Sequence, residues 1–316
     1  MTAMRARWTA ADVPDQSGRT AVVTGASGGL GLETATVLAR KGATVVLACR
    51  DLAKAGRAAE QIAAVAGRTH VRVVHLDLSR LASVRAAAEE IRSACPRLDL
   101  MINNAGVMAV PYHRTEDGFE LTLATNHLGH FALTGLVLDR LLGTGGSRIV
   151  TVSSIGHRQG YLHLDDLQLE RDYQPWPAYY QSKLANLLFT YELQSRLAAA
   201  GLGTIALAAH PGNARTDLWR TTPRLTQELY QPRLRMLTFW FAQSARTGAL
   251  ATLRAAADPA AQGGSYYGPP GRLQYTGHPV PVESSDRSHD AAAQRRLWEI
   301  SEQLTGVRYR IPAPSR

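Results

Sequence analysis

The first half of the chain alternates short runs of β-branched and other apolar residues with longer runs in which alanine and leucine recur at helical spacing. Short strands that are apolar throughout are typical of a parallel sheet covered on both faces, and the longer runs between them suit crossover helices. Because such crossovers are almost always right-handed, the pattern predicts an α/β domain with a doubly wound parallel sheet.

The predicted elements extend well into the second half of the chain. The strands are Thr20–Thr24, Ala43–Cys49, Val71–Leu76, Leu98–Ile102, Arg148–Val152, Thr204–Ala208 and Ser265–Tyr267. The helices are Gly29–Lys41, Leu52–Val65, Leu81–Ala94, Thr125–Leu142, Ala178–Ala199 and Thr247–Ala257. Residues 219–244 keep apolar residues at helical spacing but are broken by Pro223 and Pro232. The tail beyond Tyr267 is rich in proline, glycine and polar residues, so we expect no further regular element there.

Composition narrows the class of protein. With 316 residues, 45% of them apolar, the chain can bury a full core. A net charge of +9 would suit nucleic acid, but the basic residues are scattered and only Lys41, Lys54 and Lys183 are lysines, so we expect no nucleic-acid partner. Two cysteines without a CxxC pair, no apolar run of membrane-spanning length and no signal-peptide core predict a cytoplasmic protein without a membrane span.

A glycine-rich turn, TGASGGLG at residues 24–31, lies between the first predicted strand and the first predicted helix. Glycines permit a tight turn and a close approach of the backbone to a pyrophosphate, and the free N–H groups of a helix N-terminus attract anions. A purely structural turn could also use these glycines. The position between a strand and a helix favours a dinucleotide site.

Five further motifs follow the TGxxxGxG turn in a fixed order. They are Asn103–Gly106 (NNAG) after the fourth strand, Asn126 in the next helix, Ser153–Ser154 at the end of the fifth strand, Tyr179 and Lys183 as YxxxK, and Pro211–Gly212 after the sixth strand. Together the motifs resemble the short-chain dehydrogenase/reductase family. Phrases such as NHLGHFALT and YYQSKLAN are similar to its retinol dehydrogenase, WW-domain oxidoreductase and protochlorophyllide reductase subgroup.

The resemblance covers residues 17–216 and implies a single domain over residues 1–316. In that domain 17–216 bind the cofactor and carry the catalytic residues, 219–245 shape the substrate pocket, and 246–316 supply the last helix, the last strand and a tail. The sheet is expected to be of Rossmann type, with about seven strands in the order 3-2-1-4-5-6-7.

The resemblance also implies the roles of individual residues. The catalytic set is Asn126, Ser154, Tyr179 and Lys183. The cofactor set is Gly25, Ser27, Gly29, Leu30, Gly31, Arg50, Asp77, Leu78, Asn104, Ala105, Gly106, Tyr179, Lys183, Pro211, Gly212 and Thr216. Tyr179 is the acid–base group, Ser154 orients the substrate oxygen, and the backbone carbonyl of Asn126 holds a water in a proton relay to Lys183. Asp77 meets the adenine, and Thr216 reaches the nicotinamide carboxamide or the pyrophosphate.

The spacing of the YxxxK motif bears on its chemistry. Lys183 follows Tyr179 by four residues, which places both side chains on one face of a helix, whereas Tyr180 is out of this register. A neighbouring ammonium favours the phenolate, so we expect Lys183 to lower the pKa of Tyr179. Ser154 is preferred to Ser153 because successive strand side chains point to opposite faces.

The histidines suggest no metal site. His127 and His130 are three residues apart in a helix without a carboxylate or cysteine at ligand spacing, and His157 and His163 lie in the segment before Tyr179. We expect structural or surface positions for all of them.

The end of the second strand bears on the choice of cofactor. NAD-binding sheets place an acidic residue about 20 residues beyond the glycine turn, and here that position falls at Cys49 and Arg50. Arg50 can pair with a 2′-phosphate, while Asp51 is expected to cap the next helix. The sequence therefore predicts NADP(H). NAD(H) stays an alternative, since Gly28 stands where many NADP-binding relatives have a basic residue.

Three functions remain open at this stage. The first is an NADP(H)-dependent oxidoreductase acting on a small-molecule alcohol or carbonyl, for which the resemblance suggests a lipophilic substrate. The second is a non-catalytic dinucleotide sensor or scaffold, although such relatives commonly lose the Tyr or the Lys. The third, least favoured, is nucleic-acid binding. Residues 219–244 form either a packed helix pair or a mobile lid. The resemblance further implies a homodimer or homotetramer paired through the helices that carry Asn126 and Tyr179.

Overall fold

The computed structural model describes residues 7–67, 70–214 and 242–312. Within them, eight strands form one sheet in the order β3-β2-β1-β4-β5-β6-β7-β8. The strands are β1 (Thr20–Thr24), β2 (Thr44–Cys49), β3 (Val71–His75), β4 (Leu100–Asn103), β5 (Arg148–Val152), β6 (Ile205–Ala209), β7 (Tyr266–Gly268) and β8 (Val280–Pro281). Strands β1 to β7 pair in parallel, which confirms the predicted order, and β8 adds an antiparallel edge beside β7.

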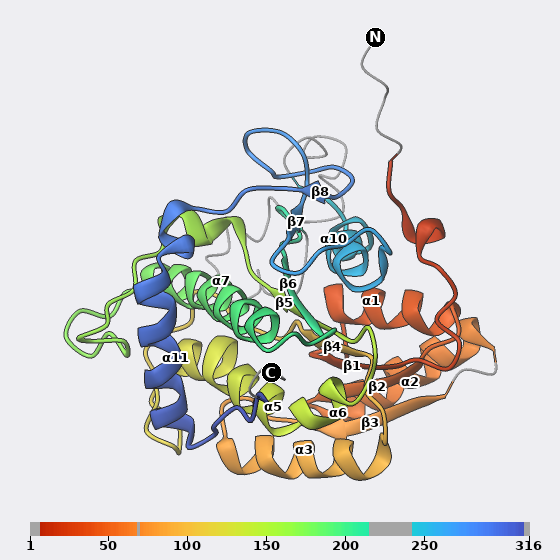
Figure 1. Cartoon of the computed structure of the whole chain (residues 1–316), viewed down its shortest axis with the longest axis horizontal. Helices are drawn as coiled ribbons and strands as arrows, with labels where there is room; N and C mark the ends of the chain where they lie inside the picture. Colours follow the sequence, from red (N-terminus) through yellow and green to blue (C-terminus); the bar gives the residue numbers. More distant parts are fainter. Residues whose placement is uncertain (1–6, 68–69, 215–241, 313–316) are drawn as a thin grey trace.

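Helices cover both faces of the sheet (Figure 1). They are α1 (Gly29–Arg40), α2 (Leu52–Ala66), α3 (Leu81–Ala94), α4 (Leu121–Leu123), α5 (Gly129–Leu136), α6 (Leu138–Leu142), α7 (Pro175–Ala199), α10 (Ala245–Ala257) and α11 (Ala291–Thr305). Side chains alternate along each strand, so Ala21 and Val23 of β1 join the core under α1, α2 and α10, while Val22 joins the core under α3, α5 and α7. The molecule is thus the doubly wound sandwich that the sequence predicts.

The predicted helix Thr125–Leu142 is interrupted, so this part of the prediction is wrong. A π-helical turn at Ala124–Leu128 joins α4 to α5, and Val137, with φ −104° and ψ 6°, separates α5 from α6. A π-helical turn inserts one residue into the helical register, which changes the direction of the backbone groups around Asn126. Hydrophobic spacing alone does not reveal such an insertion.

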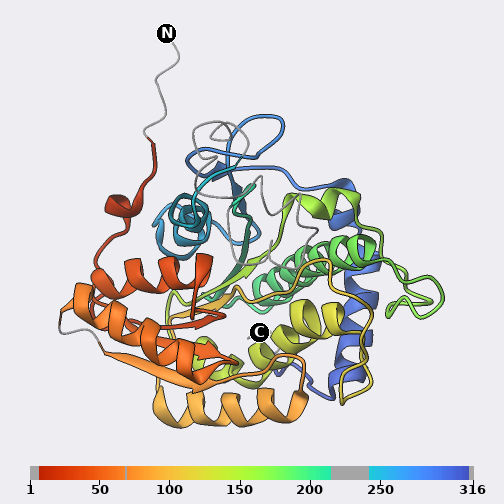
Figure 2. The same cartoon turned by 180° about the vertical axis from the view of Figure 1, so that it is seen from behind.

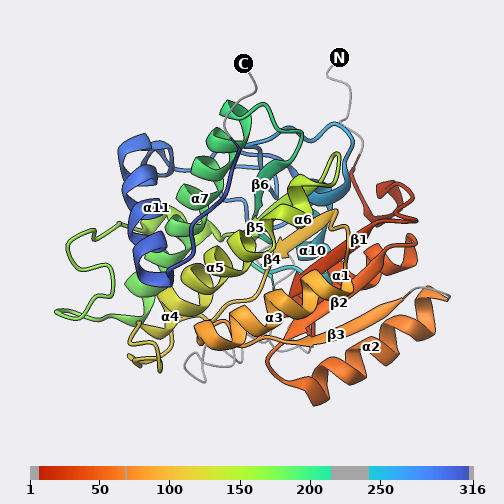
Figure 3. The same ribbon diagram turned by 60° about the horizontal axis from the view of Figure 1, so that its bottom comes forward.

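The expectation that no regular element follows Tyr267 is also wrong. Helix α11 runs from Ala291 to Thr305 and packs on α7 and α5 (Figure 3). Asp290 caps its N-terminus, accepting hydrogen bonds from two backbone N–H groups, and Gly306 ends it in the left-handed region at φ 64°. These two capping signals are readable in the sequence. The helix was missed because its apolar stripe is short.

An aromatic cluster fastens the tail to the two central helices. Trp298 of α11 lies 5.2 Å from the ring of Phe131 and 5.9 Å from that of Phe189, measured between ring centres. Tyr309 donates a hydrogen bond of 2.7 Å to the backbone carbonyl of Phe131. At Gly135 a Cβ would lie 2.7 Å from the Tyr309 ring, so the residue must be glycine. A homodimer paired through these faces of α5 and α7 would have to displace α11.

The predicted pocket segment, residues 219–245, lies outside the described residues except at its last four positions, and so does Thr216. In the part of the chain that the structure does describe, no helix is long and apolar enough to cross a bilayer.

Four histidines are almost completely buried in the described core: His127, His130, His157 and His210. Burial penalises the imidazolium, which lowers the pKa of His127 and His210 to about 3 and the pKa of His130 and His157 to about 4. All four are therefore neutral at physiological pH. His163, by contrast, lies at the surface.

These buried histidines should make the fold sensitive to acid. The unfolded chain takes up protons below pH 6.5 while the folded histidines stay neutral down to about pH 4, so stability falls as the pH drops through this window. Each histidine contributes up to about 1.4 kcal/mol per pH unit. Urea unfolding of the parent, of His127→Gln and of the exposed-site control His75→Gln between pH 4 and 6.5 measures the slope. We expect a shallower slope for His127→Gln alone, and equal slopes in all three would contradict the prediction.

Candidate active site

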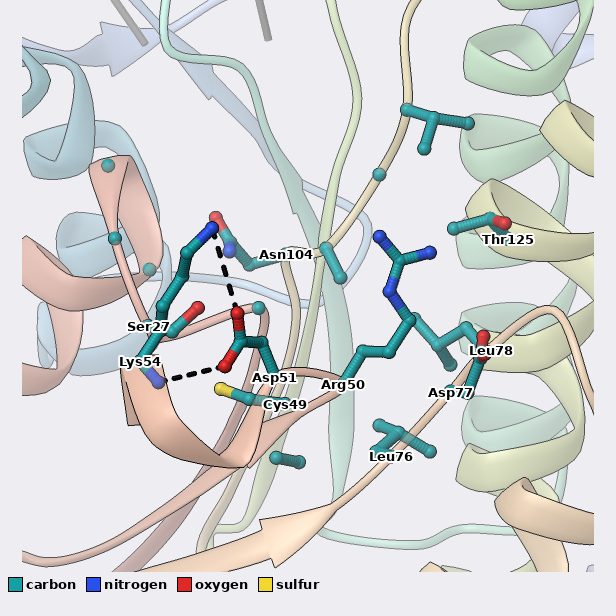
Figure 4. A pocket seen from close by; sticks show the side chains of 18 of the residues that line it. Ser27, Cys49, Arg50, Asp51, Lys54, Leu76, Asp77, Leu78, Asn104 and Thr125 are labelled. Carbon is teal, nitrogen blue, oxygen red and sulfur yellow. Dashed lines mark hydrogen bonds and ion pairs between the residues drawn. The ribbon is translucent and has the colours of Figure 1, made fainter. Parts of the chain in front are cut away.

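The carboxyl ends of β1 to β4 border a cleft of about 370 Å³ (Figure 4). Its lining includes eleven residues of the predicted cofactor set: Gly25, Ser27, Gly29, Leu30, Gly31, Arg50, Asp77, Leu78, Asn104, Ala105 and Gly106. These residues come from four separate turns of the chain, and parallel strands bring the turns to one edge of the sheet.

The glycine-rich turn has the close packing that its sequence predicts. Gly25 and Gly29 adopt φ of +66° and +55°, which other residues rarely do. A Cβ on Gly31 would lie 2.5 Å from the carbonyl oxygen of Gly25, so no side chain fits there. Helix α1 begins at Gly29 with no side chain capping its N–H groups. Those N–H groups are therefore available to an anion such as a pyrophosphate.

Thr24 fastens this turn to the NNAG segment. Its Oγ1 accepts hydrogen bonds from the backbone N–H groups of Asn104 and Ala105, both at 2.9 Å, and Asn104 Nδ2 donates to the Thr24 carbonyl at 2.8 Å. The side chain of Asn104 is thus occupied by the protein. Thr24 was predicted as part of the motif but not as a site residue. A hydroxyl residue at the end of the first strand, in a chain that also has an NNAG segment, could have identified it.

Two basic side chains, those of Arg50 and Lys54, line the cleft near the end of β2, where the ribose end of a dinucleotide is expected. Figure 4 shows the Lys54 ammonium beside Asp51, whereas the Arg50 guanidinium points away from Asp51 toward the side of the cleft that carries Leu78 and Thr125. Asp51 Oδ1 accepts a 2.9 Å hydrogen bond from the backbone N–H of Lys54, which confirms the predicted cap and holds the pKa of Asp51 below its usual value. Lys54 Nζ lies 3.7 Å from Asp51 Oδ2. Sequence reasoning missed Lys54, one helical turn after Arg50.

Asp77 lies in the cleft lining but its carboxylate is engaged locally. Oδ1 accepts hydrogen bonds from the backbone N–H of Ser79 at 3.0 Å and from its hydroxyl at 2.6 Å. The Asp77 backbone N–H donates to Ser83 Oγ at 2.9 Å. The turn after β3 is therefore fixed, and Asp77 and Leu78 form the wall of the cleft opposite the glycine-rich turn.

Tyr179 and Lys183 lie one turn apart on α7, which crosses the carboxyl end of β5. Burial raises the pKa of Tyr179 to about 12, and a hydrogen bond to the Ser154 side chain acts in the opposite direction. Burial lowers the pKa of Lys183 to about 8. Its Nζ donates to the carbonyl of Val152 at 3.1 Å and lies 5.8 Å from the centre of the Tyr179 ring.

The expectation that Lys183 lowers the pKa of Tyr179 is therefore wrong for the protein alone. Desolvation has the largest effect on the Tyr179 phenol, and the Lys183 ammonium lies 5.8 Å from the centre of its ring. Tyr179 carries its proton at neutral pH and Lys183 carries its charge.

The two serines at the end of β5 point in different directions, as the strand alternation predicts. Ser153 is buried and its Oγ donates to the Lys183 carbonyl at 2.7 Å, so it fastens β5 to α7. Ser154 is half-buried, interacts with Tyr179, and accepts from the Gly156 N–H at 3.1 Å. His157 Nδ1 donates to the Ser154 carbonyl at 2.7 Å, which holds the serine turn in place.

Asn126 uses its side chain to hold the loop after β4. Oδ1 accepts from the Val107 N–H at 2.8 Å, and Nδ2 donates to the Val107 carbonyl at 3.0 Å and to Ser182 Oγ at 2.9 Å. A Cβ on Gly106 would lie 3.0 Å from Asn126 Oδ1 and 3.5 Å from Lys183 Nζ. Gly106, Asn126 and Lys183 thus meet at one point, where the Asn126 amide is engaged with Val107 and Ser182.

The neighbours of Tyr179 distinguish it from Tyr180. Tyr180 lines a separate open cavity of about 930 Å³ formed with residues 159–177, whereas Tyr179 faces Ser154. Trp176 is half-buried, with its ring 6.2 Å from that of Tyr179. Trp176, Val107 and Met108 are apolar residues near the reaction centre and the cleft that sequence reasoning did not identify.

Pro211 and Gly212 follow β6 and lie outside the cleft lining. Gly212 adopts φ +63°, and a Cβ there would lie 2.3 Å from the Tyr275 carbonyl oxygen, so the turn requires glycine. Gly248 of α10 packs against both Pro211 and Leu30, which places this turn close to the start of α1. In the described ranges no group of three or more histidine, cysteine or acidic residues could hold a metal ion.

Comparisons with known proteins agree with this geometry. The family model described as short chain dehydrogenase matches residues 19–225. The chain is 41% identical to retinol dehydrogenase 13 of Homo sapiens over 293 residues, covering 92% of this chain and 85% of that protein. It is 40% identical to retinol dehydrogenase 11 of Mus musculus over 292 residues, covering 92% and 87%.

Solved structures also match this chain in fold. The crystal structure of an uncharacterized protein from Mycobacterium paratuberculosis matches with a TM-score of 0.79 and 46% identity, covering 97% of this chain and 99% of that one. L-sorbose reductase from Gluconobacter frateurii, with a TM-score of 0.67 at 23% identity over 83% and 99% of the chains, shares the fold. This chain belongs to the short-chain dehydrogenase family.

Proposed function

We propose that this chain is an NADP(H)-dependent oxidoreductase that transfers a hydride between the nicotinamide and the carbon of a lipophilic alcohol or carbonyl compound. The observation that carries the proposal is the meeting of Ser154, Tyr179 and Lys183 at the end of β5, beside a cleft whose glycine-rich turn suits a pyrophosphate. The complete set of catalytic side chains argues against a purely non-catalytic scaffold.

The protonation states suit carbonyl reduction. The nicotinamide supplies or accepts the hydride when it is bound. With a pKa of about 12, Tyr179 holds a proton that it can donate to a carbonyl oxygen as that oxygen becomes a hydroxyl, while Ser154 orients the oxygen. Lys183, with a pKa of about 8, is charged at neutral pH and stabilises the phenolate that remains.

Arg50 and Lys54 support NADP(H) over NAD(H). Both line the cleft at the end of β2, where a carboxylate would select a free ribose hydroxyl. The carboxylate that is present, Asp51, is occupied by the Lys54 backbone N–H and lies close to the Lys54 ammonium. A 2′-phosphate bound at Arg50 would gain a charge-assisted contact, and Lys54 adds a second positive charge to the cleft, which offsets the neutral Gly28 in the turn.

Apolar neighbours and relatives support a lipophilic substrate. Trp176 lies beside Tyr179, and Val107 and Met108 line the cleft next to Gly106. The relatives that match over 92% of this chain are named retinol dehydrogenases. An aromatic wall near the hydride-transfer position would favour a bulky apolar alcohol or carbonyl compound over a small polar one.

Replacing Tyr179 by Phe tests the proposed reaction. The substitution keeps the ring but removes the proton donor, so we expect kcat to fall by at least roughly 100-fold while cofactor binding persists. Tyr180→Phe is the matched control and should keep near-parental turnover. Turnover of NADPH with apolar ketones and aldehydes, with cofactor affinity measured by NADPH fluorescence, decides the outcome. A Tyr179→Phe enzyme with near-normal kcat would refute the mechanism.

The cofactor preference is tested at the rim of the cleft. Losing one charge-assisted contact, worth roughly 1.5–3 kcal/mol, should cut kcat/KM for NADPH about 10- to 150-fold in Arg50→Ala. Lys54→Ala should lose less, because Lys54 is already close to Asp51. NADH efficiency should hardly change in either variant. Arg40→Ala, at the far end of α1, is the charge-matched control, and a parent that prefers NADH would overturn the assignment.

The substrate class is tested at Trp176. Removing the indole takes away apolar contact area, so Trp176→Ala should raise KM for bulky apolar ketones by about 10-fold. KM for small polar ketones should stay within about 3-fold of the parent, because such substrates lack this contact. Steady-state kinetics with both classes measures the difference. Equal changes for both classes would remove Trp176 from the substrate site.

A further inference from the structure

A buried histidine connects two parts of the site that are distant in sequence. His130 lies at the start of α5 with only 1% of its surface exposed. Its Nδ1 is 3.1 Å from the backbone carbonyl oxygen of Asn126, and its Nε2 is 2.8 Å from Oγ1 of Thr24. One imidazole therefore spans from the π-helical turn to the residue that begins the glycine-rich turn.

The neighbours of His130 determine which ring nitrogen carries the hydrogen. A carbonyl oxygen can only accept, so Nδ1 must donate to Asn126. Thr24 Oγ1 already accepts from the N–H groups of Asn104 and Ala105, which occupies both of its lone pairs. Its hydroxyl hydrogen is what remains for Nε2. His130 is thus a neutral imidazole with the hydrogen on Nδ1, and its Nε2 lone pair accepts from the Thr24 hydroxyl.

The surroundings keep this ring neutral. Burial lowers the pKa of His130 to about 4, the bond to the Asn126 carbonyl raises it, and the charge of Lys183 lowers it. His127, on the adjoining π-helical turn, also faces His130 and is itself neutral, with a pKa of about 3. Lys183 and Tyr179 on α7 are the titratable groups of the reaction centre nearby. The positive charge of Lys183 therefore favours a neutral ring at His130.

We propose that His130 is a positioning residue for the Lys183 end of the reaction centre. The Asn126 side chain holds Val107 and Ser182, and the Asn126 backbone carbonyl is the atom that His130 contacts. The π-helical turn displaces that carbonyl from regular helical bonding, and His130 Nδ1 fixes its direction. Through Thr24, the same ring links this carbonyl to the turn that receives the cofactor.

The effect on turnover rests on the function proposed above, whereas the hydrogen-bond arrangement stands independently of it. Two variants separate the two ends of the imidazole. In His130→Asn the amide nitrogen takes the place of Nδ1 and can still donate to Asn126, and Thr24 can turn its hydroxyl to the Ile102 carbonyl 3.3 Å away. In His130→Gln the amide reaches the place of Nε2 and keeps the Thr24 contact but leaves the Asn126 carbonyl without its donor.

We expect the two variants to differ in catalysis, and the kcat–pH profile is the readout that a purely structural loss would not move. His130→Gln should lower kcat by about 10-fold and shift the apparent pKa of the kcat–pH profile, because a buried carbonyl has lost its donor beside Lys183. His130→Asn should keep the parental profile and stay within about 3-fold in kcat. Both should keep a similar KM for NADPH, whereas the unpaired carbonyl should also lower the melting temperature of His130→Gln. Identical profiles in the two variants would overturn the proposal.

A spectroscopic measurement tests the arrangement without any turnover. The ring nitrogens of the parent protein, labelled with ¹⁵N-histidine, report the tautomer, and the His130 signals are those missing from His130→Gln. We expect a protonated Nδ1 and an unprotonated Nε2 that do not titrate between about pH 5 and 8. An Nε2-protonated ring, or titration near pH 6.5, would refute the inference. If the parent lacked oxidoreductase activity, the proposed function would fail while this measurement still decided the tautomer.

Discussion

The hydroxyl of Thr24 is the point on which the cofactor side of the site depends. It lies where β1 and β4 end side by side, and it accepts from the two N–H groups that open the NNAG loop. Such saturation of a buried hydroxyl fixes both turns relative to each other, since moving either one would leave a buried N–H unpaired. The glycines then follow as a steric requirement: Gly31 packs onto Gly25 because the turn is held so tightly.

Helix α7, which carries Tyr179 and Lys183, is held by the C-terminal segment on the side that faces away from the sheet. Helix α7 lies between the sheet and α11, and Figure 2 shows the two helices side by side from the back of the molecule. Trp298 stacks on Phe189 of α7, and the N–H of Ser285 donates to His157, which in turn holds the Ser154 carbonyl. The C-terminal segment thus supports the serine turn and the YxxxK helix, although neither motif lies near it in sequence.

The sequence predicted the fold and most of the residues that line the cleft because strand alternation and short motifs are local signals. Glycine spacing specified the turn at Gly25–Gly31, and the Asp51 cap was confirmed. Lys54 was missed because its place at the cleft depends on where α2 begins. The pKa of Tyr179 was mispredicted because one-dimensional spacing contains the Lys183 partner but not the extent of burial. The π-helical turn depends on tertiary packing, which hydrophobic periodicity does not encode, whereas α11 has capping signals that the sequence does contain.

Burial restricts the charges that this site can tolerate. Lys183 has a pKa of about 8, so a further buried cation nearby would drive it toward its neutral form, which cannot stabilise a phenolate. A neutral imidazole can make two hydrogen bonds in a buried site without adding a charge. One of its nitrogens donates while the other, on the opposite edge of the ring, accepts. His130 and His157 both use this property, each donating from Nδ1 to a backbone carbonyl of a residue that we propose to be catalytic. Two neutral histidines therefore fix Asn126 and Ser154 while the ammonium of Lys183 keeps its charge.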